Sequence, residues 1–216
     1  MAIENSQQNF KNRRLARVIR ISAELFLEKG IADVKMTDIA EKCGLGVATL
    51  YRHFSTKTGV LIAAVTYMWG EIREMFRDVF DSDIFLRQTG LKQMTDLMRM
   101  YGVLYNAHKD FLRLVAEFDA FILREHVPKE ELVEYDRSII NFYPIFERAY
   151  QAGLADGTVR EVENFPLLYR TIAHSLMELS KKLVQGELIP SDNFENAEAE
   201  IAAFIDIASN YFRKKG

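Results

Sequence analysis

The sequence has few of the residues that interrupt helices or cross-link chains. Among 216 residues there are four prolines, eleven glycines and one cysteine. A single cysteine excludes a disulfide framework, and long segments rich in Ala, Leu, Glu, Lys, Arg and Met favour helices. No alternating run of Val, Ile and Thr with hairpin turns is present. The sequence therefore predicts an all-α protein of about nine helices, with enough apolar residues for a substantial core.

The residue pairs that build metal or catalytic centres are also missing. No two histidines stand at a metal-binding spacing, no Glu-x-x-His motif occurs, and Cys43 has no catalytic partner in the sequence. The glycines of Gly44-x-Gly46 follow no predicted strand, so they indicate a turn and not a phosphate loop. We therefore expect a protein that is not an enzyme and that uses no metal and no cofactor.

Neither a targeting signal nor a membrane-spanning segment is evident. Met1–Phe10 is polar and lacks an apolar signal core. The longest apolar run near it, Val60–Val65, is far shorter than the roughly 20 residues of a membrane helix. We therefore expect a cytoplasmic protein.

The net charge of −3 conceals an uneven distribution. Residues 1–60 carry ten Lys and Arg against six Asp and Glu, whereas residues 61–216 carry eighteen against twenty-five. A basic first part, called the head below, suits a protein that binds a polyanion such as nucleic acid through these residues. A difference of this size can also arise by chance.

The segment Thr37–Lys57 contains the end signals of two short helices. Thr37 is a good N-cap, and Gly44 suits the left-handed residue that often follows a helix. Gly46 opens a second helix after a three-residue turn. Two helices joined by a short turn with glycine form a helix-turn-helix, although similar pairs also serve as plain corners in helical proteins.

The second of these helices has an apolar and a polar face. Its apolar residues recur at helical spacing and should face the protein: Val47, Leu50 and Phe54. Ala48, Thr49 and Arg52 then point outward, where small residues permit close approach to base edges and the others can bond to them. Flanking side chains can donate to phosphates, which sets the register on DNA without reading its sequence: Tyr51, His53 and Lys57.

Residues Leu15–Trp69 resemble the N-terminal domain of TetR-family transcriptional regulators. The resemblance is carried by ISAELFLEKG from Ile21, MTDIAEKCG from Met36 and LGVATLYRHF from Leu45, completed by STK at 55–57. The string Leu-Tyr-x-His-Phe followed by Lys57 is its most specific part. The sequence departs from the family pattern at two places, Thr58, where Glu is common, and Gly46-Val47, where Lys or Ser often stands. The resemblance implies a three-helix DNA-binding domain followed by a larger helical domain that binds an effector and dimerises.

Arginines on the first predicted helix extend the candidate DNA-binding set. A run of arginines is usually a solvated face, but beside a helix-turn-helix we favour phosphate contacts. The predicted DNA-binding residues are Arg13, Arg14, Arg17, Lys35, Thr37, Gly46, Val47, Ala48, Thr49, Tyr51, Arg52, His53 and Lys57.

The expected organisation is a DNA-binding domain at residues 1–56 and an effector-binding and dimerisation domain at 57–216. A polar tail over residues 1–9 precedes a first helix that ends at Gly30, and a helix from Thr56 to about Val79 spans the domain boundary. The larger domain is predicted to hold helices over 88–107, 108–126, 129–152, 165–185 and 194–213. Pro144 should kink the third of these.

The last two predicted helices are amphipathic. Such a pair can form a four-helix interface with the same pair from a second chain, or it can simply close the monomer core. The family resemblance implies the dimer. The predicted interface residues are Leu168, Ile172, Leu176, Leu179, Leu183, Ile201, Phe204, Ile205, Ala208 and Tyr211.

Met and aromatic side chains gather in the middle of the chain. They suit an apolar ligand, although such stripes are more often plain core. Glu117, Asp119 or Glu178 could pair with a cationic ligand, with solvated surface as the bland alternative. The predicted pocket residues are Met98, Tyr101, Tyr105, Phe118, Phe121, Phe142 and Phe146.

These observations predict a ligand-responsive, sequence-specific DNA-binding transcriptional regulator. We expect a repressor that binds a palindromic operator on double-stranded DNA as a homodimer and is released by a small apolar or aromatic effector. The alternative is an architectural or protein-recruiting DNA-binding factor with the same head and no effector. A helical enzyme or scaffold with a relic head is a third possibility.

Overall fold

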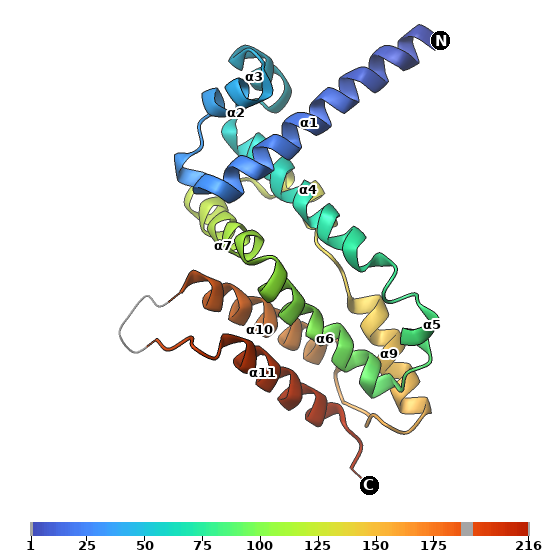
Figure 1. Cartoon of the computed structure of the whole chain (residues 1–216). Helices are drawn as coiled ribbons and strands as arrows, with labels where there is room; N and C mark the ends of the chain where they lie inside the picture. Colours follow the sequence, from blue (N-terminus) through green and yellow to red (C-terminus); the bar gives the residue numbers. More distant parts are fainter. Residues whose placement is uncertain (1, 187–191, 216) are drawn as a thin grey trace. The chain divides into compact units, whose positions relative to one another are not determined.

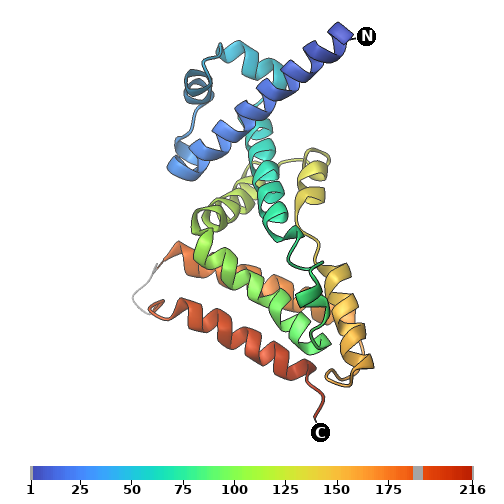
Figure 2. The same cartoon turned by 45° about the vertical axis from the view of Figure 1, so that its right-hand side comes forward.

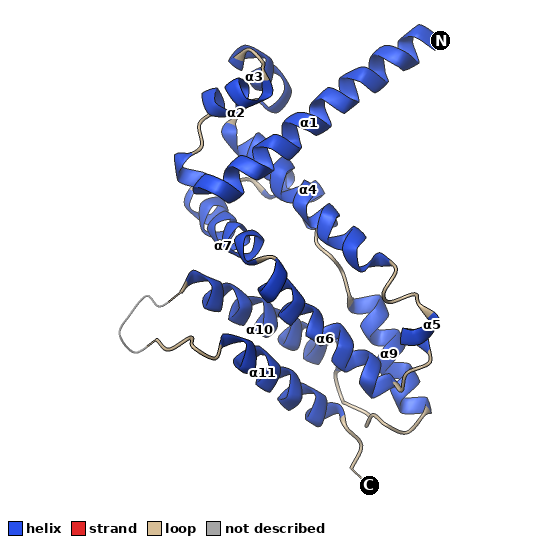
Figure 3. Cartoon of the chain, in the orientation of Figure 1, coloured by secondary structure: helices blue, strands red, loops and turns tan. Residues whose placement is uncertain are grey.

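The computed structural model describes residues 2–186 and 192–215, with side chains described from Arg13 onward. Within these ranges the secondary structure is helical, apart from an isolated bridge between Val159 and Arg213 (Figure 3). The α-helices are α1 Ala2–Asp33, α2 Met36–Cys43, α3 Val47–Phe54, α4 Lys57–Arg77, α5 Asp83–Leu86, α6 Gly90–Ala107, α7 Lys109–Arg124, α8 Val133–Ser138, α9 Tyr143–Ala155, α10 Phe165–Gln185 and α11 Ala197–Phe212. A 3-10 helix, η1, covers Lys129–Leu132. The all-α prediction is confirmed.

The chain forms two compact units, each built from separate stretches of sequence. Unit 1 comprises the chain up to Arg73 together with Leu114–Ile140, and unit 2 comprises Glu74–Arg113 together with the chain from Asn141. This division differs from the expected boundary at residue 56, for two reasons. The first half of α4 is buried within unit 1, where Val60 and Leu61 are fully inaccessible, and a later segment returns to unit 1. Helices α4 and α7 therefore each contain residues of both units.

In unit 1, α1 begins at Ala2, so the expected polar tail is helical (Figure 1), and Met1 lies outside the described residues. The regular part of α1 ends at Gly30, as expected. Gly30 has φ 77° and ψ 167°, a backbone conformation that essentially only glycine adopts. Beyond this kink α1 continues for one short helical turn, Ile31–Asp33, called here the turn after α1, which leads to α2.

The expected kinked helix over residues 129–152 is instead divided into η1, α8 and α9. Residues 139–142 are not helical, and Pro144 lies in the first turn of α9. The prediction of a kink was wrong because Pro144 lies in the first turn of a new helix, where N–H groups have no intrahelical partner and proline fits. This division and the short α5 account for the helices beyond the expected number.

In unit 2, α6 packs against α9, α10 and α11, which run beside it in both views (Figures 1 and 2). The contact with α9 is backbone to backbone, since a Cβ atom added at Gly90 would lie 2.0 Å from the Gly153 nitrogen. Asp156, in the turn after α9, accepts a hydrogen bond from the Gly90 N–H at 2.8 Å. The start of α6 is therefore held against α9 by a close backbone contact and by a hydrogen bond to Asp156.

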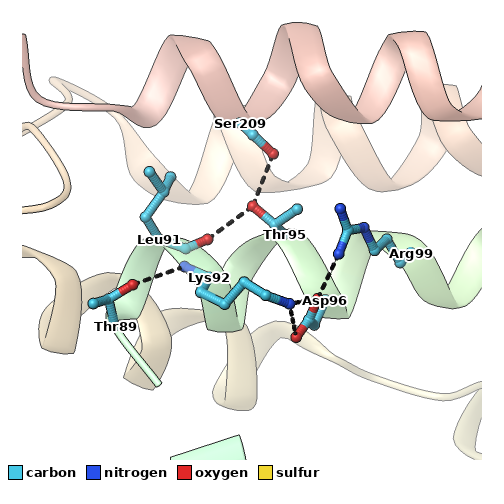
Figure 4. A network of polar contacts seen from close by, with 7 residues as sticks. All are labelled: Thr89, Leu91, Lys92, Thr95, Asp96, Arg99 and Ser209. Carbon is cyan, nitrogen blue, oxygen red and sulfur yellow. Dashed lines mark hydrogen bonds and ion pairs between the residues drawn. The ribbon is translucent and has the colours of Figure 1, made fainter. Parts of the chain in front are cut away.

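Side-chain hydrogen bonds fix the first turns of α6 and join it to α11 (Figure 4). The Thr89 hydroxyl accepts from the Lys92 N–H at 3.4 Å. The Thr95 hydroxyl donates to the Leu91 carbonyl and shares a hydrogen bond with the Ser209 hydroxyl of α11 at 3.0 Å. Asp96 pairs with both Lys92 and Arg99 on the exposed side of the helix.

Across the residues described, no helix has the length and apolar character needed to cross a membrane.

Candidate DNA-binding interface and ligand pocket

Helices α2 and α3 form the expected helix-turn-helix. Gly44 adopts the left-handed conformation, with φ 65° and ψ 40°, and the Leu45 N–H returns to the Ala40 carbonyl at 2.9 Å. Gly46 is the N-cap of α3, and its carbonyl accepts from the Thr49 N–H at 2.9 Å. The glycine-based prediction of the turn is therefore confirmed.

The start of α2 differs from the prediction. Lys35 is the N-cap residue, and Thr37 is the second residue of the helix. The Asp38 carboxylate accepts from the Lys35 backbone N–H at 2.9 Å, so the start of α2 is closed by Asp38 and not by a Thr37 cap. Lys35 and Thr37 both remain exposed.

One face of α3 is open to solvent. Leu50 is its only fully buried residue, at 1% exposure, while Val47 and Phe54 are half-buried. Thr49 is half-buried as well, and the other side chains of the helix are exposed: Ala48, Tyr51, Arg52 and His53. Small residues at the start of this face and Arg52 in its second turn can reach the base edges of a major groove.

A basic groove lies beside the helix-turn-helix. Arg13, Arg14 and Arg17 of α1 line it together with the α2–α3 turn, and its volume is about 460 Å³. All three arginines are exposed, as phosphate contacts require. Cys43 lines the same groove. Burial raises the pKa of its thiol, and Arg17 lowers that pKa only in part, so Cys43 packs as an uncharged thiol.

The side chain of Lys57, the first residue of α4, contacts the end of α1. Its ammonium group donates to the Ile31 carbonyl and, at 3.4 Å, to the Ala32 carbonyl at the end of α1. Burial lowers the pKa of Lys57, while Asp33 and Asp38 raise it in part. Lys57 is half-buried and holds the turn after α1 through these two contacts, so its phosphate contact stays a prediction.

The predicted ligand pocket is only partly brought together. Met98, Tyr101, Phe142 and Phe146 line one cavity in unit 2, with Tyr169 and apolar residues of α10 completing the wall. Tyr105 instead lines a separate groove between α6 and α11. Phe118 and Phe121 belong to unit 1, where the ring centroids of Phe118 and Tyr135 are 4.8 Å apart. Tyr105, Phe118 and Phe121 therefore do not line this cavity, because one helical stripe serves different cores along its length.

The cavity is small, and its lining carries no charged side chain. Its volume is about 10 Å³, which is close to the space of a single water molecule. Burial raises the pKa of Tyr169 to about 12, although a hydrogen bond with the Phe142 backbone lowers it in part. Burial also raises the pKa of Tyr101, and Tyr169 adds to the effect. Two neutral hydroxyl groups are therefore the polar features of an apolar wall.

Most of the predicted dimer stripe belongs to the core of the monomer. Six of its residues are buried within the chain: Ile172, Leu176, Leu183, Ile201, Ile205 and Ala208. Leu168, Leu179 and Phe204 are half-buried, and Tyr211 is 51% exposed. Beside them, Leu167 and Ile207 are 52% and 68% exposed. The apolar face of α10 and α11 that is open to a partner thus lies to one side of the predicted stripe.

Three features were missed from the sequence. Leu167 and Ile207 are apolar residues outside the periodic stripe of their helices, which was the available signal for a second apolar face. Tyr169 stands on the predicted helix over residues 165–185 and could have been added as an aromatic wall residue. Glu117 of α7 binds the Ile31 backbone, a contact between residues 86 positions apart for which the sequence offers no signal.

Helices α2 and α3, joined by a short glycine turn and with α3 largely exposed, form a helix-turn-helix, a motif that many DNA-binding proteins share. Residues 18–64 match the family model described as "Bacterial regulatory proteins, tetR family". A relative in Bacillus subtilis, the uncharacterized HTH-type transcriptional regulator YerO, is 27% identical over 201 residues, covering 90% of this chain and 62% of that protein. The chain thus spans less than two thirds of that relative.

Solved structures share the fold. A TetR-family regulator from Mesorhizobium loti superposes with a TM-score of 0.66 at 15% identity, over 94% of this chain and 98% of that one. The regulator FadR from Bacillus subtilis, solved in complex with stearoyl-CoA, has a TM-score of 0.58 at 16% identity, over 92% of this chain and 100% of that one. The chain is thus similar to TetR-family regulators in residues 18–64 and shares their fold over most of its length.

Proposed function

We propose that this chain is a cytoplasmic, sequence-specific DNA-binding repressor that responds to a small ligand. The outward face of α3 carries the proposal. Ala48 and Thr49 leave room for base edges at the start of the helix, and Arg52 can make a bidentate contact with guanine. The exposed arginines of the adjoining groove supply phosphate contacts that set the register.

The proposed active form is a homodimer on a palindromic operator. The exposed apolar face of α10 and α11, with Leu167, Ile207 and Tyr211 at its centre, supports association with a second copy. Two recognition helices would then enter successive major grooves about 34–36 Å apart. Replacing Ile207 with Asp should shift the protein to monomers in sedimentation, whereas Ile84→Asp, at the 80%-exposed position on α5, should leave the dimer intact.

The effector is proposed to be an uncharged apolar or aromatic molecule, or one that buries such a part. The lining of the unit 2 cavity contains no charged side chain, so a buried charge would lack a partner there. The hydroxyl groups of Tyr101 and Tyr169 offer the only polar contacts in this lining. Ligand pockets generally measure about 300–1,000 Å³, so binding requires the cavity to open and α6 and α10 to move apart. A ligand lowers operator affinity only as far as it favours the opened state.

A second candidate is a DNA-binding architectural factor with the same head and no effector. The small cavity volume, about 10 Å³, favours this alternative. A thermal-shift screen with neutral aromatic compounds separates the two. A stabilising compound whose effect falls in Tyr169→Phe but not in Tyr105→Phe supports the effector, since Tyr105 lies outside the cavity lining. A screen without such a compound would favour the architectural factor.

The DNA-binding proposal is tested by selecting random duplexes with the purified protein at two salt concentrations. We expect a palindrome and a steep loss of affinity with salt. Arg52→Ala should lose about 1–3 kcal/mol of discrimination at one base pair in each half-site. Arg87→Ala, on the exposed surface of unit 2, is the matched control and should select the wild-type palindrome. The absence of any enriched sequence at low salt would refute the proposal.

A further inference from the structure

The turn after α1, Ile31–Asp33, is held by side chains from two other helices. Gly30 has non-helical dihedral angles, so α1 is kinked there and continues to Asp33. Glu117 of α7 accepts from the Ile31 N–H at 2.9 Å. Lys57 of α4 donates to the Ile31 and Ala32 carbonyls from the other side. Both ends of the turn are therefore satisfied by groups outside the helix-turn-helix.

The position of Glu117 is itself well defined. The next residue, Phe118, is fully buried, and its ring packs edge-on against Tyr135 within unit 1. Leu114, Val115 and Phe121 are buried on the same helix. A Cβ atom at Gly30 would lie 3.3 Å from the Glu117 carboxylate, so the carboxylate lies directly against the backbone of the turn. The segment of α7 that carries Glu117 thus presents its carboxylate at a fixed place.

We infer that Glu117 is a positioning residue for operator binding. By holding the Ile31 N–H, it fixes the turn from which α2 and α3 continue, and so it orders the recognition helix without touching DNA. The inference rests on the proposed function, since it concerns how the DNA-binding face is presented. Glu117 is exposed, as the solvated alternative expected, but its carboxylate also binds the Ile31 backbone, which gives it a role other than pairing with a cationic ligand.

The expected effect is on the ordered fraction of the head and not on the number of phosphate contacts. An apparent dissociation constant rises in inverse proportion to the fraction of molecules in the competent state. If loss of the hydrogen bond leaves each head competent about one third of the time, a dimer with two heads binds its operator about tenfold more weakly. The slope of log affinity against log salt stays unchanged, because no cation is removed.

The test compares full-length wild type with Glu117→Ala, Glu117→Gln and the control Glu130→Ala. Glu130 is an exposed carboxylate on η1 of the same unit. Hydrogen–deuterium exchange should quicken in peptides covering residues 30–44 of Glu117→Ala, with exchange in α6, α10 and α11 unchanged. Operator affinity should fall about tenfold with the wild-type salt slope. Glu117→Gln should recover most of both, because an amide oxygen still accepts from the Ile31 N–H, and Glu130→Ala should match the wild type.

Three results would overturn the inference. The first is wild-type exchange at residues 30–44 in Glu117→Ala, and the second is faster exchange there with wild-type operator affinity. The third is an equal rise in exchange throughout the chain, which would indicate a general loss of stability. Failure of the wild type to select DNA is seen without any variant. It would refute the proposed function and the positioning role with it, while the exchange data would still report whether Glu117 orders the turn.

Discussion

Lys57 and Arg17 carry the same charge in unit 1 but should contribute differently to operator binding. The structure leaves five of the predicted DNA-binding cations exposed: Arg13, Arg14, Arg17, Lys35 and Arg52. Lys57 instead donates to the Ile31 and Ala32 carbonyls. We expect Arg17→Ala to remove phosphate contacts and Lys57→Ala to loosen the turn after α1.

The size of the difference follows from counterion release. Affinity for duplex DNA falls with a log–log salt slope of about −0.9 for each phosphate neutralised, so losing Arg17 from both heads should make the slope shallower by about 1.8. Between 50 and 200 mM salt, this corresponds to a change of about twelvefold in relative affinity. For Lys57→Ala the slope should stay at the wild-type value, and the free energy of unfolding should fall by about 1 kcal/mol because two carbonyl groups lose a partner.

Fluorescence anisotropy on the selected operator at four salt concentrations measures the slopes, and urea unfolding measures stability. Arg87→Ala, outside the head, controls for the general loss of one positive charge. A slope that becomes shallower by the same amount in Lys57→Ala as in Arg17→Ala would refute the reasoning, since it would mean that Lys57 leaves its carbonyl partners to bind phosphate.

Three further predictions concern unit 2. Gly90→Ala should lower the free energy of unfolding by about 3 kcal/mol, because the new Cβ would lie 2.0–2.3 Å from the Gly153 backbone. Urea titrations measure this change, and an unchanged unfolding midpoint would contradict the close contact. Partial burial alone would raise the pKa of Asp156, but hydrogen bonds from Thr158 and Gly90 outweigh it and lower that pKa. Asp156 therefore stabilises the fold near neutral pH, and this contribution is lost as the pH falls below about 4. In urea titrations, the loss of unfolding free energy in Asp156→Asn should shrink over the same pH range. The pKa of Tyr169 is raised to about 12 by burial. Its contribution to the free energy of unfolding is therefore complete below the unfolded pKa of about 10 and is lost as the pH rises from 10 to 12. The stability of Tyr169→Phe should be less sensitive to alkali, and its ultraviolet titration should show one fewer late-titrating tyrosine.

The parts of the fold that the sequence predicted correctly depend on contacts between near neighbours. The left-handed conformation of Gly44 and the entry to α3 at Gly46 follow from the requirements of helix ends, which involve residues at most five positions apart. The breakdown of regular helix at Gly30 has the same local origin. The family model matches residues 18–64, the part of the chain where these local signals are concentrated.

The sequence by itself therefore determined an all-helical chain, its helix-turn-helix and the outward face of α3, because helical periodicity and end signals are local. Only the tertiary structure decided what each helix face meets. It divided the aromatic stripe between two cores, placed most of the predicted dimer stripe inside the monomer, and bound Lys57 and Glu117 to the turn after α1. These outcomes depend on contacts between residues far apart in the chain, and a pattern along one helix shows that a face is apolar without showing which partner covers it.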